Sequence, residues 1–131
     1  LYSSIVEQGQ ADIVLAFENL EALRALPYMK DGGTMIINTQ EILPMPVITG
    51  SVKYPADCLE RVREAVKTVE LDAVDIAHEC GTYKAANVVL MGVVAKKLPF
   101  SVEEWHKAIE QCVKPKFLEI NLKAFDRGYQ Y

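Results

Sequence analysis

The hydrophobic pattern of the first 38 residues alternates continuous apolar runs with an amphipathic segment. Residues 13–17 form a continuous apolar run of the kind that buried parallel strands show, and residues 34–38, "TMIIN", predict a second buried strand. Between them, leucines recur every third position over residues 20–26 and predict a helix that ends at Pro27. The following "KDGG", residues 30–33, predicts a turn, because glycine adopts positive φ at no steric cost. This stretch therefore predicts a β-α-β unit.

A proline-rich stretch follows, and three prolines and a glycine within residues 39–55 disfavour a regular element over most of it. A short edge strand over residues 47–49 stays open as an alternative. A D-x-x-E start at Asp57 and apolar residues on one face then predict an amphipathic helix that ends near Thr68. Residues 68–73 predict a third short strand.

The second half of the chain reads as mainly helical. Residues 73–80 predict a helix that Gly81 stops. Residues 83–97 are apolar on nearly every side, which predicts a central helix that buries Leu90 and Met91. A buried strand is the alternative for this valine-rich run, although its length favours a helix.

Two more helices are predicted before the end of the sequence. Ser101 and Glu104 form a capping-box pair that starts one of them, with Val102, Trp105, Ile109 and Cys112 as its buried stripe. The last helix is expected from Phe117 toward Arg127, with Gly128 as its stop. Strands that alternate with helices predict an α/β fold: a three-layer open sheet, mostly parallel, with helices on both faces.

Composition and charge narrow the classes of partner. The 131 residues are 50% hydrophobic and carry a net charge of −4, which is typical of one globular domain and gives no reason to expect nucleic acid as a partner. No apolar run reaches the roughly 18 residues of a membrane span, so no membrane partner is expected. Cys58, Cys80 and Cys112 are widely spaced, which indicates reduced thiols in a cytoplasm rather than a disulfide framework or a metal site.

Candidate functional residues follow the predicted strands, because open α/β sheets bind ligands beyond the carboxyl ends of their strands. Glu18 follows the first strand, where a helix N-terminal carboxylate is the structural alternative, contributing about 0.3–1 kcal/mol. Asn38 and Thr39 follow the second strand, where they are ligand-facing candidates or local turn residues. Asn87 is expected to be a buried amide that bonds a neighbouring loop, a partner or a ligand.

No self-sufficient catalytic constellation is visible. His78 and His106 have no second ligand at a metal-site spacing, and no cysteine has a histidine nearby to act as its base. The sequence also has no P-loop, no nucleophile elbow and no dinucleotide fingerprint. We therefore expect no catalytic residue and no metal site in this chain.

Four segments carry a family resemblance, in the family's order and over most of the chain: "ADIVLAFENLEALRALPYMK", "GGTMIINTQEILP", "GTYKAANVVLMGVVA" and "NLKAFDRG". Together they resemble the gamma-type domain of 2-oxoacid:ferredoxin oxidoreductases, in particular of members that act on indolepyruvate. Family members open with a glycine-rich strand–turn–helix that is absent here. Because the sequence starts at Leu1 and "LYSSIVEQGQ" leads straight into a strand, residues 1–131 are expected to be the C-terminal part of such a domain, in an N-terminally truncated fragment.

The resemblance implies a subunit of an enzyme that uses thiamine diphosphate and Mg²⁺. It converts a 2-oxoacid, here indolepyruvate or another aryl pyruvate, and coenzyme A into acyl-CoA and CO₂. Electrons pass through iron–sulfur clusters to ferredoxin. These cofactors lie on other domains or subunits, so the implied partner is a thiamine-binding, iron–sulfur subunit, and the isolated fragment is expected to be inactive. Self-association stays open. The rival hypothesis is a stand-alone nucleotide-binding or regulatory α/β domain.

Overall fold

The computed structural model describes residues 5–131, so the start of the predicted lead-in at Leu1 lies outside the described residues. The chain divides into two compact units, the first ending at Leu71 and the second spanning Asp72–Tyr131. Over residues 5–131, no helix is both long enough and apolar enough to cross a membrane.

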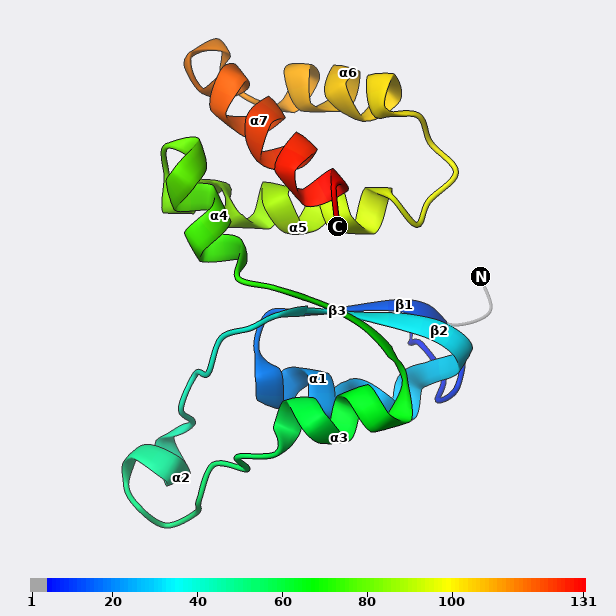
Figure 1. The fold of residues 1–131 in the computed structure, drawn as a ribbon, viewed down its shortest axis with the longest axis vertical. Helices are drawn as coiled ribbons and strands as arrows, with labels where there is room; N and C mark the ends of the chain where they lie inside the picture. The colour runs from blue at the N-terminus through cyan, green and yellow to red at the C-terminus, as the bar shows by residue number, and fades with distance from the viewer. Residues whose placement is uncertain (1–4) are drawn as a thin grey trace. The chain divides into compact units, whose positions relative to one another are not determined.

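Three parallel strands form the sheet of the first unit: β1 (Ala11–Ala16), β2 (Met29–Asn38) and β3 (Lys67–Leu71). They lie in the order β1-β2-β3, and Ile36 in the central strand pairs with Leu15 on one side and Val69 on the other. Residues 34–38 are all buried, including the polar Thr34 and Asn38, in agreement with the predicted buried strand. The predicted open, parallel α/β sheet is confirmed, and Figure 1 shows its strands with the helices of this unit.

The predicted turn at residues 30–33 is wrong, because these residues belong to β2. Ala11 pairs with Met29 but Ile13 pairs with Thr34, so two steps along β1 face five steps along β2. This bulge accommodates Gly32 at a φ of 78°, a conformation that favours glycine. The glycine signal in the sequence therefore marks an irregularity within a strand rather than a turn that precedes one.

Two helices of the first unit, α1 (Asn19–Ala25) and α3 (Cys58–Ala65), contact each other and lie on the same face of the sheet (Figure 1). The core of this unit includes the buried side chains of Met35, Ile37 and Val62. Between α1 and β2, Pro27 lies in a 3₁₀ turn, η1 (Leu26–Tyr28), as expected for a residue that cannot continue an α-helix. Helix α3 ends at Ala65, before the predicted Thr68, because Val66 is already extended.

The proline-rich stretch contains a four-residue helix, α2 (Met45–Ile48), and no strand, so the edge-strand alternative for residues 47–49 is wrong. Pro46 lies in the first turn, where a helix needs no N–H donor and where the fixed φ of proline is already helical. The prolines that disfavour a strand in this stretch are therefore compatible with the start of a short helix.

The second unit is helical. Its elements are α4 (Ala73–Cys80), η2 (Tyr83–Ala85), α5 (Ala86–Ala95), α6 (Val102–Cys112), η3 (Pro115–Phe117) and α7 (Leu118–Tyr129). The capping box of Ser101 and Glu104 is confirmed, and Gly81 follows α4 as predicted. The helical interpretation of the apolar run is also confirmed, and Leu90 is 1% exposed whereas Met91 is only partly buried.

Helices α5 and α7 pack against each other at two glycines. A Cβ atom on Gly128 would overlap the carbonyl oxygen of Val89, and a Cβ on Gly92 would overlap that of Phe125. The prediction that Gly128 stops the last helix is therefore wrong, since α7 runs on to Tyr129. Gly128 is needed for close approach of two backbones, a tertiary requirement that local sequence does not reveal.

An aromatic cluster joins α6 to α7. The Phe125 ring is fully buried and lies 5.9 Å from Trp105 and 6.0 Å from Tyr129, measured between ring centroids. The predicted buried stripe of α6 is correct at Ile109 but wrong at Cys112, which is exposed because it lies in the last turn of that helix.

Candidate functional site

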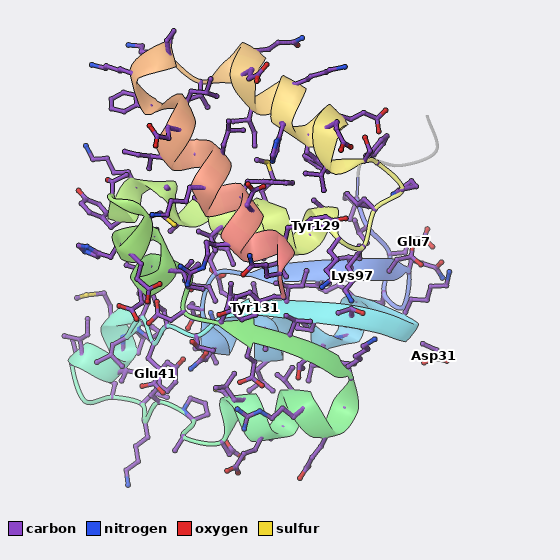
Figure 2. The ribbon with its side chains drawn as sticks, turned by 45° about the horizontal axis from the view of Figure 1, so that its top comes forward. Glu7, Asp31, Glu41, Lys97, Tyr129 and Tyr131 are labelled. Carbon is purple, nitrogen blue, oxygen red and sulfur yellow. The ribbon has the colours of Figure 1, made fainter. Side chains whose placement is uncertain are left out.

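The candidate site lies where β1 and β2 end. We call it the carboxyl edge and define it by Glu18, Asn19, Asn38, Thr39, Gln40 and Tyr54. Figure 2 labels Asp31 and Glu41, which mark the opposite ends of β2, and the carboxyl edge is at the Glu41 end. Parallel strands bring their carboxyl ends to the same side of a sheet, so residues that follow different strands meet there.

Glu18 is a buried carboxylate, 5% exposed, at the N-cap of α1. Its Oε1 accepts from the backbone N–H of Glu21 at 2.7 Å, and its Oε2 accepts from the N–H of Leu20 at 3.0 Å. The Tyr54 hydroxyl also donates to Oε2, at 3.1 Å. Because three donors satisfy this buried charge, its main role in this geometry is to cap the helix and anchor the chain around Tyr54.

The Tyr54 hydroxyl is held in its protonated form. Burial, together with the hydrogen bond to Glu18, raises the pKa of Tyr54 well above its ordinary value of 10.0. Ionised tyrosine would place a second negative charge beside the Glu18 carboxylate, which explains the direction of the shift. Tyr54 therefore acts as a hydrogen-bond donor, and no base function is assigned to it.

Asn38 connects the ends of the two strands. Its Nδ2 donates to the carbonyl oxygen of Phe17 at 3.2 Å and to Oε1 of Gln40 at 3.2 Å, and the residue is 4% exposed. The next residue, Thr39, is half-buried and donates its backbone N–H to the carbonyl of Leu71, at the end of β3. Three of the four predicted candidates, Glu18, Asn38 and Thr39, are therefore brought together.

Asn19 carries an unsatisfied acceptor. It is 6% exposed, its backbone N–H donates to the carbonyl of Gln40 at 2.9 Å, and its Oδ1 is buried without a hydrogen-bond partner among the described residues. A buried acceptor left unpaired costs about 1–3 kcal/mol, so its retention calls for an explanation. A donor supplied by a bound ligand or a neighbouring chain would provide one.

Asn87 is different from the other candidates. The sequence predicts a buried amide, but Asn87 is exposed at the start of α5, so that expectation is wrong. The apolar run places small residues around it, and the helix turns this position outward while Val89 and Leu90 are buried. Asn87 lies in the second unit, and its role in binding a partner stays a prediction.

The cysteines do not form a cofactor site. All three are free, Cys58 and Cys80 being buried and Cys112 exposed. The Cys58 Sγ donates to the carbonyl of Pro55 at 3.1 Å, and burial, followed by the charge of Asp57, raises the pKa of the thiol. Iron–sulfur ligation needs adjacent thiolates, which a buried, protonated and separately bonded thiol does not supply.

Metal ligands are not grouped either. Among residues 5–131, no three His, Cys, Asp or Glu side chains lie close enough to hold a metal ion. The described residues therefore offer no all-protein cage for a metal ion.

One acid–base pair appears that the sequence analysis missed. His106 Nε2 lies 2.6 Å from Asp126 Oδ1, although the two residues are 20 positions apart, on α6 and α7. The histidine ring also packs edge-to-face on Phe125, with centroids 5.6 Å apart. The carboxylate is 51% exposed, so this pair joins two helices at the surface of the second unit.

Sequence reasoning also missed Asn19 and Tyr54. Asn19 follows Glu18 directly and reads as an ordinary first-turn residue, so no local signal distinguishes it. Tyr54 is 36 residues from Glu18 and lies in a stretch that the prolines mark as irregular. A tyrosine beside a proline gives no indication of its partner, which only the folded chain supplies.

Together, the parallel sheet and its polar carboxyl edge define an α/β protein of the type that places ligands or partners beyond its strand ends. The family model described as pyruvate ferredoxin/flavodoxin oxidoreductase matches residues 2–131. The chain belongs to this family.

Curated relatives agree with the family assignment. The chain is 37% identical to the indolepyruvate oxidoreductase subunit IorB of Pyrococcus horikoshii, over 98% of this chain and 66% of that protein. It is 35% identical to the subunit of the same name from Thermococcus kodakarensis, with the same coverage, and 32% identical to that of Archaeoglobus fulgidus, over 95% of this chain and 65% of that protein. The chain therefore spans about two thirds of the length of these relatives.

Solved structures share the fold. The gamma subunit of a keto/oxoacid ferredoxin oxidoreductase from Geobacter sulfurreducens has a TM-score of 0.66 at 23% identity, over 96% of this chain and 66% of that one. The pyruvate oxidoreductase subunit PORC from Thermotoga maritima has a TM-score of 0.67 at 19% identity, over 93% and 64%. A 2-oxoglutarate:ferredoxin oxidoreductase from Magnetococcus marinus, solved with coenzyme A, scores 0.65 at 19% identity, over 98% of this chain but 21% of that one.

Proposed function

We propose that this chain is part of a subunit of a 2-oxoacid:ferredoxin oxidoreductase, corresponding to the beta subunit of indolepyruvate ferredoxin oxidoreductase. The observation that carries this proposal is the similarity of nearly the whole chain to subunits with that substrate in their names, at 32–37% identity. The complex would convert indolepyruvate or another aryl pyruvate and coenzyme A into acyl-CoA and CO₂, and pass two electrons to ferredoxin.

The chemistry would be supplied outside this chain. Thiamine diphosphate with Mg²⁺ would activate the oxoacid, and iron–sulfur clusters would carry the electrons, on a partner subunit. Two features of the described residues support placing these cofactors on the partner subunit. The Cys58 thiol is hydrogen-bonded to the Pro55 carbonyl, and no cluster of metal ligands occurs among the described residues. The three free thiols support a cytoplasmic location.

Within this function, the chain's own residues would position rather than react. Glu18 and Tyr54 fix the start of α1, while Asn38 and Thr39 hold the strand ends. The carboxyl edge is composed of amides, a carboxylate, a phenol and the Thr39 hydroxyl and has no cationic side chain, so it suits a neutral hydrogen-bonding group better than a phosphate. The amide-containing arm of coenzyme A has that chemistry, and its N–H groups would satisfy Asn19 Oδ1. Asn87 would face a partner from α5.

The test is reconstitution of the complex from the full-length subunit and its thiamine-binding partner. Reduction of ferredoxin is measured with indolepyruvate, phenylpyruvate, pyruvate and 2-oxoglutarate, each with and without coenzyme A. We expect turnover with the aryl pyruvates only when both chains are present. Turnover by this subunit alone, or a complex that reduces no ferredoxin with any of the four acids, would overturn the proposal.

The positioning role needs its own variant. Asn19→Ala removes the unpaired acceptor without removing a hydrogen bond that its side-chain oxygen makes in the described structure. If this oxygen accepts from coenzyme A, KM for coenzyme A should rise about tenfold, which corresponds to one lost hydrogen bond, with kcat little changed. An unchanged KM would remove Asn19 from the binding residues while leaving the subunit assignment intact.

A further inference from the structure

The segment between β2 and α3 exposes more apolar surface than its length explains. We call residues 42–52 the apolar loop. Its exposed apolar side chains, with their exposed fractions, are Ile42 (60%), Leu43 (47%), Met45 (67%), Ile48 (61%) and Val52 (57%). Residues 42–52 include no Asp, Glu, Lys, Arg or His. Scattered apolar residues on a surface need no explanation, but five within eleven positions indicate a surface that another molecule covers.

The apolar loop is also held in a defined shape. Pro44 caps α2 and accepts from the backbone N–H groups of Val47 and Ile48 at 2.9 and 3.0 Å, and Gly50 closes the turn with a φ of 77°. At the end of the segment, the Tyr54 hydroxyl bonds the buried Glu18. A surface that is fixed before binding loses less conformational entropy on association, which favours a protein interface over a flexible connection.

Two positive charges line a hollow beside this surface. A hollow of about 250 Å³ lies between α1 and the loop, and its lining includes Pro44, Pro46 and Val52 together with Arg24 and Lys53. The ion pairs found among the described residues include neither of these two cations. An apolar centre with a charged rim is the usual anatomy of a protein–protein interface, and this rim calls for acidic groups opposite.

We propose that the apolar loop is the docking surface for the partner subunit of the oxidoreductase, through a partner patch with an apolar centre and acidic residues at its edge. This inference rests on the proposed function. The choice of a different chain is supported by the relatives, which are named as subunits, and by the occurrence of the same fold as 21% of one much longer chain.

The test measures binding of the full-length subunit to the separately purified partner subunit by isothermal titration calorimetry. Val52→Glu and Ile48→Glu should each raise Kd about 30-fold or more, the effect of losing an interface hot spot. Val6→Glu is the matched control, because Val6 lies in the same unit but outside the loop and has the same exposed fraction as Val52, 57%. It should leave Kd within about threefold of the wild type.

A charge variant tests the rim. Arg24→Glu should weaken binding at low ionic strength and lose much of that effect at about 0.5 M salt, because rim charges are screened. The apolar-loop variants should keep their effect at both salt concentrations. An Arg24→Glu effect that is independent of salt would contradict the acidic rim assigned to the partner.

The other outcomes separate this inference from the proposed function. Unchanged Kd in Val52→Glu and Ile48→Glu, with a normal wild-type complex, would overturn the docking surface and leave the function standing. If the wild-type subunit binds no partner, both proposals fail. A dimer of the isolated subunit that Ile48→Glu disperses would assign the surface to a second copy. A fall in the free energy of unfolding of isolated Ile48→Glu would assign it to the subunit's own chain. Either result would overturn the inference.

Discussion

The carboxyl edge of the first unit and the α5–α7 contact of the second are both tightly built, but in opposite ways. At the edge, the buried Glu18 carboxylate is stabilised by three hydrogen-bond donors. At the helix contact, the absence of two side chains lets Gly92 and Gly128 bring the backbones together. The helix contact is therefore built from close packing, whereas the edge is built around buried polar groups.

Each unit has one buried side-chain polar atom without a hydrogen-bond partner among the described residues: Asn19 Oδ1 at the edge and Trp105 Nε1 on α6. The packing contact at Gly128 is explained by stability, because it brings two backbones together. A buried acceptor without a donor lowers stability, and the proposed binding of coenzyme A would account for the one at Asn19. Variants at the helix contact should therefore lower the free energy of unfolding. Variants at the carboxyl edge should change either the free energy of unfolding or the binding of a ligand.

The largest expected effect is in the helical unit. Leu90→Ala should lower the free energy of unfolding by about 2–5 kcal/mol, because the side chain is 1% exposed and its loss leaves a cavity. Urea denaturation followed by Trp105 fluorescence measures this, since Trp105 is the single tryptophan and lies in α6. Asn87→Ala, at an exposed position on the same helix, is the control and should stay within about 0.5 kcal/mol. A similarly small loss for Leu90→Ala would mean that α5 is not central.

Gly128→Ala tests the backbone contact itself. Alanine is favoured over glycine inside a helix by about 1 kcal/mol, so an unconstrained position would gain stability. Here the added Cβ would overlap the Val89 carbonyl oxygen, and separating the helices should cost about 3 kcal/mol, the upper end for overpacking. The same fluorescence assay gives the sign. A stabilised variant would show that α5 and α7 are not in close contact.

Glu18→Gln tests the edge. The amide keeps the shape but replaces a carboxylate oxygen with an NH₂ group that faces donors, so stability should fall by about 1.5–3 kcal/mol. This loss is larger than the 0.3–1 kcal/mol of a helix-end charge, because the group is buried and accepts three hydrogen bonds. Denaturation is followed by circular dichroism. Glu21→Gln, which affects only the exposed bond to the Phe17 N–H, should cost less than about 1 kcal/mol.

Tyr54→Phe has the smallest expected effect and adds a dependence on pH. It removes one donor to Glu18 and should cost about 0.5–1.5 kcal/mol near neutral pH. The folded state raises the pKa of Tyr54, so the stability contributed by the protonated phenol is present below the unfolded pKa of 10.0 and is lost as pH rises toward the folded pKa. The gap between wild type and variant should therefore narrow above about pH 10. A gap that is constant to pH 11.5 would contradict the contact.

Elements whose structure is decided by one local signal were predictable from the sequence. The capping box at Ser101 and Glu104 and the helix over Ala73–Cys80 needed only neighbouring residues, and both are confirmed. Glycines were harder to interpret, because the same residue serves a turn, a bulge or a close contact. Gly32 proved to be in a bulge and Gly128 in a helix contact, and in each case the partner lies far away in sequence.

The candidate site was predictable only in part. The ends of buried strands pointed to Glu18, Asn38 and Thr39, which do meet at the carboxyl edge, but Asn87 proved to be exposed in the other unit. Asn87 lies in a helix that is apolar on nearly every side. Because such a helix has no distinct polar face, its sequence does not show which position faces outward.

By itself, the sequence determined the parallel α/β class, the order of the main elements and the family, because apolar periodicity and capping chemistry are local and the family segments follow one another along the chain. Only the tertiary structure decided that Tyr54 bonds Glu18, that Asn19 keeps an unpaired oxygen and that Gly128 lies against Val89. The physical reason is distance along the chain. Each of these features depends on donors, acceptors or backbone atoms that separate elements bring together, and no local pattern encodes which of them will meet.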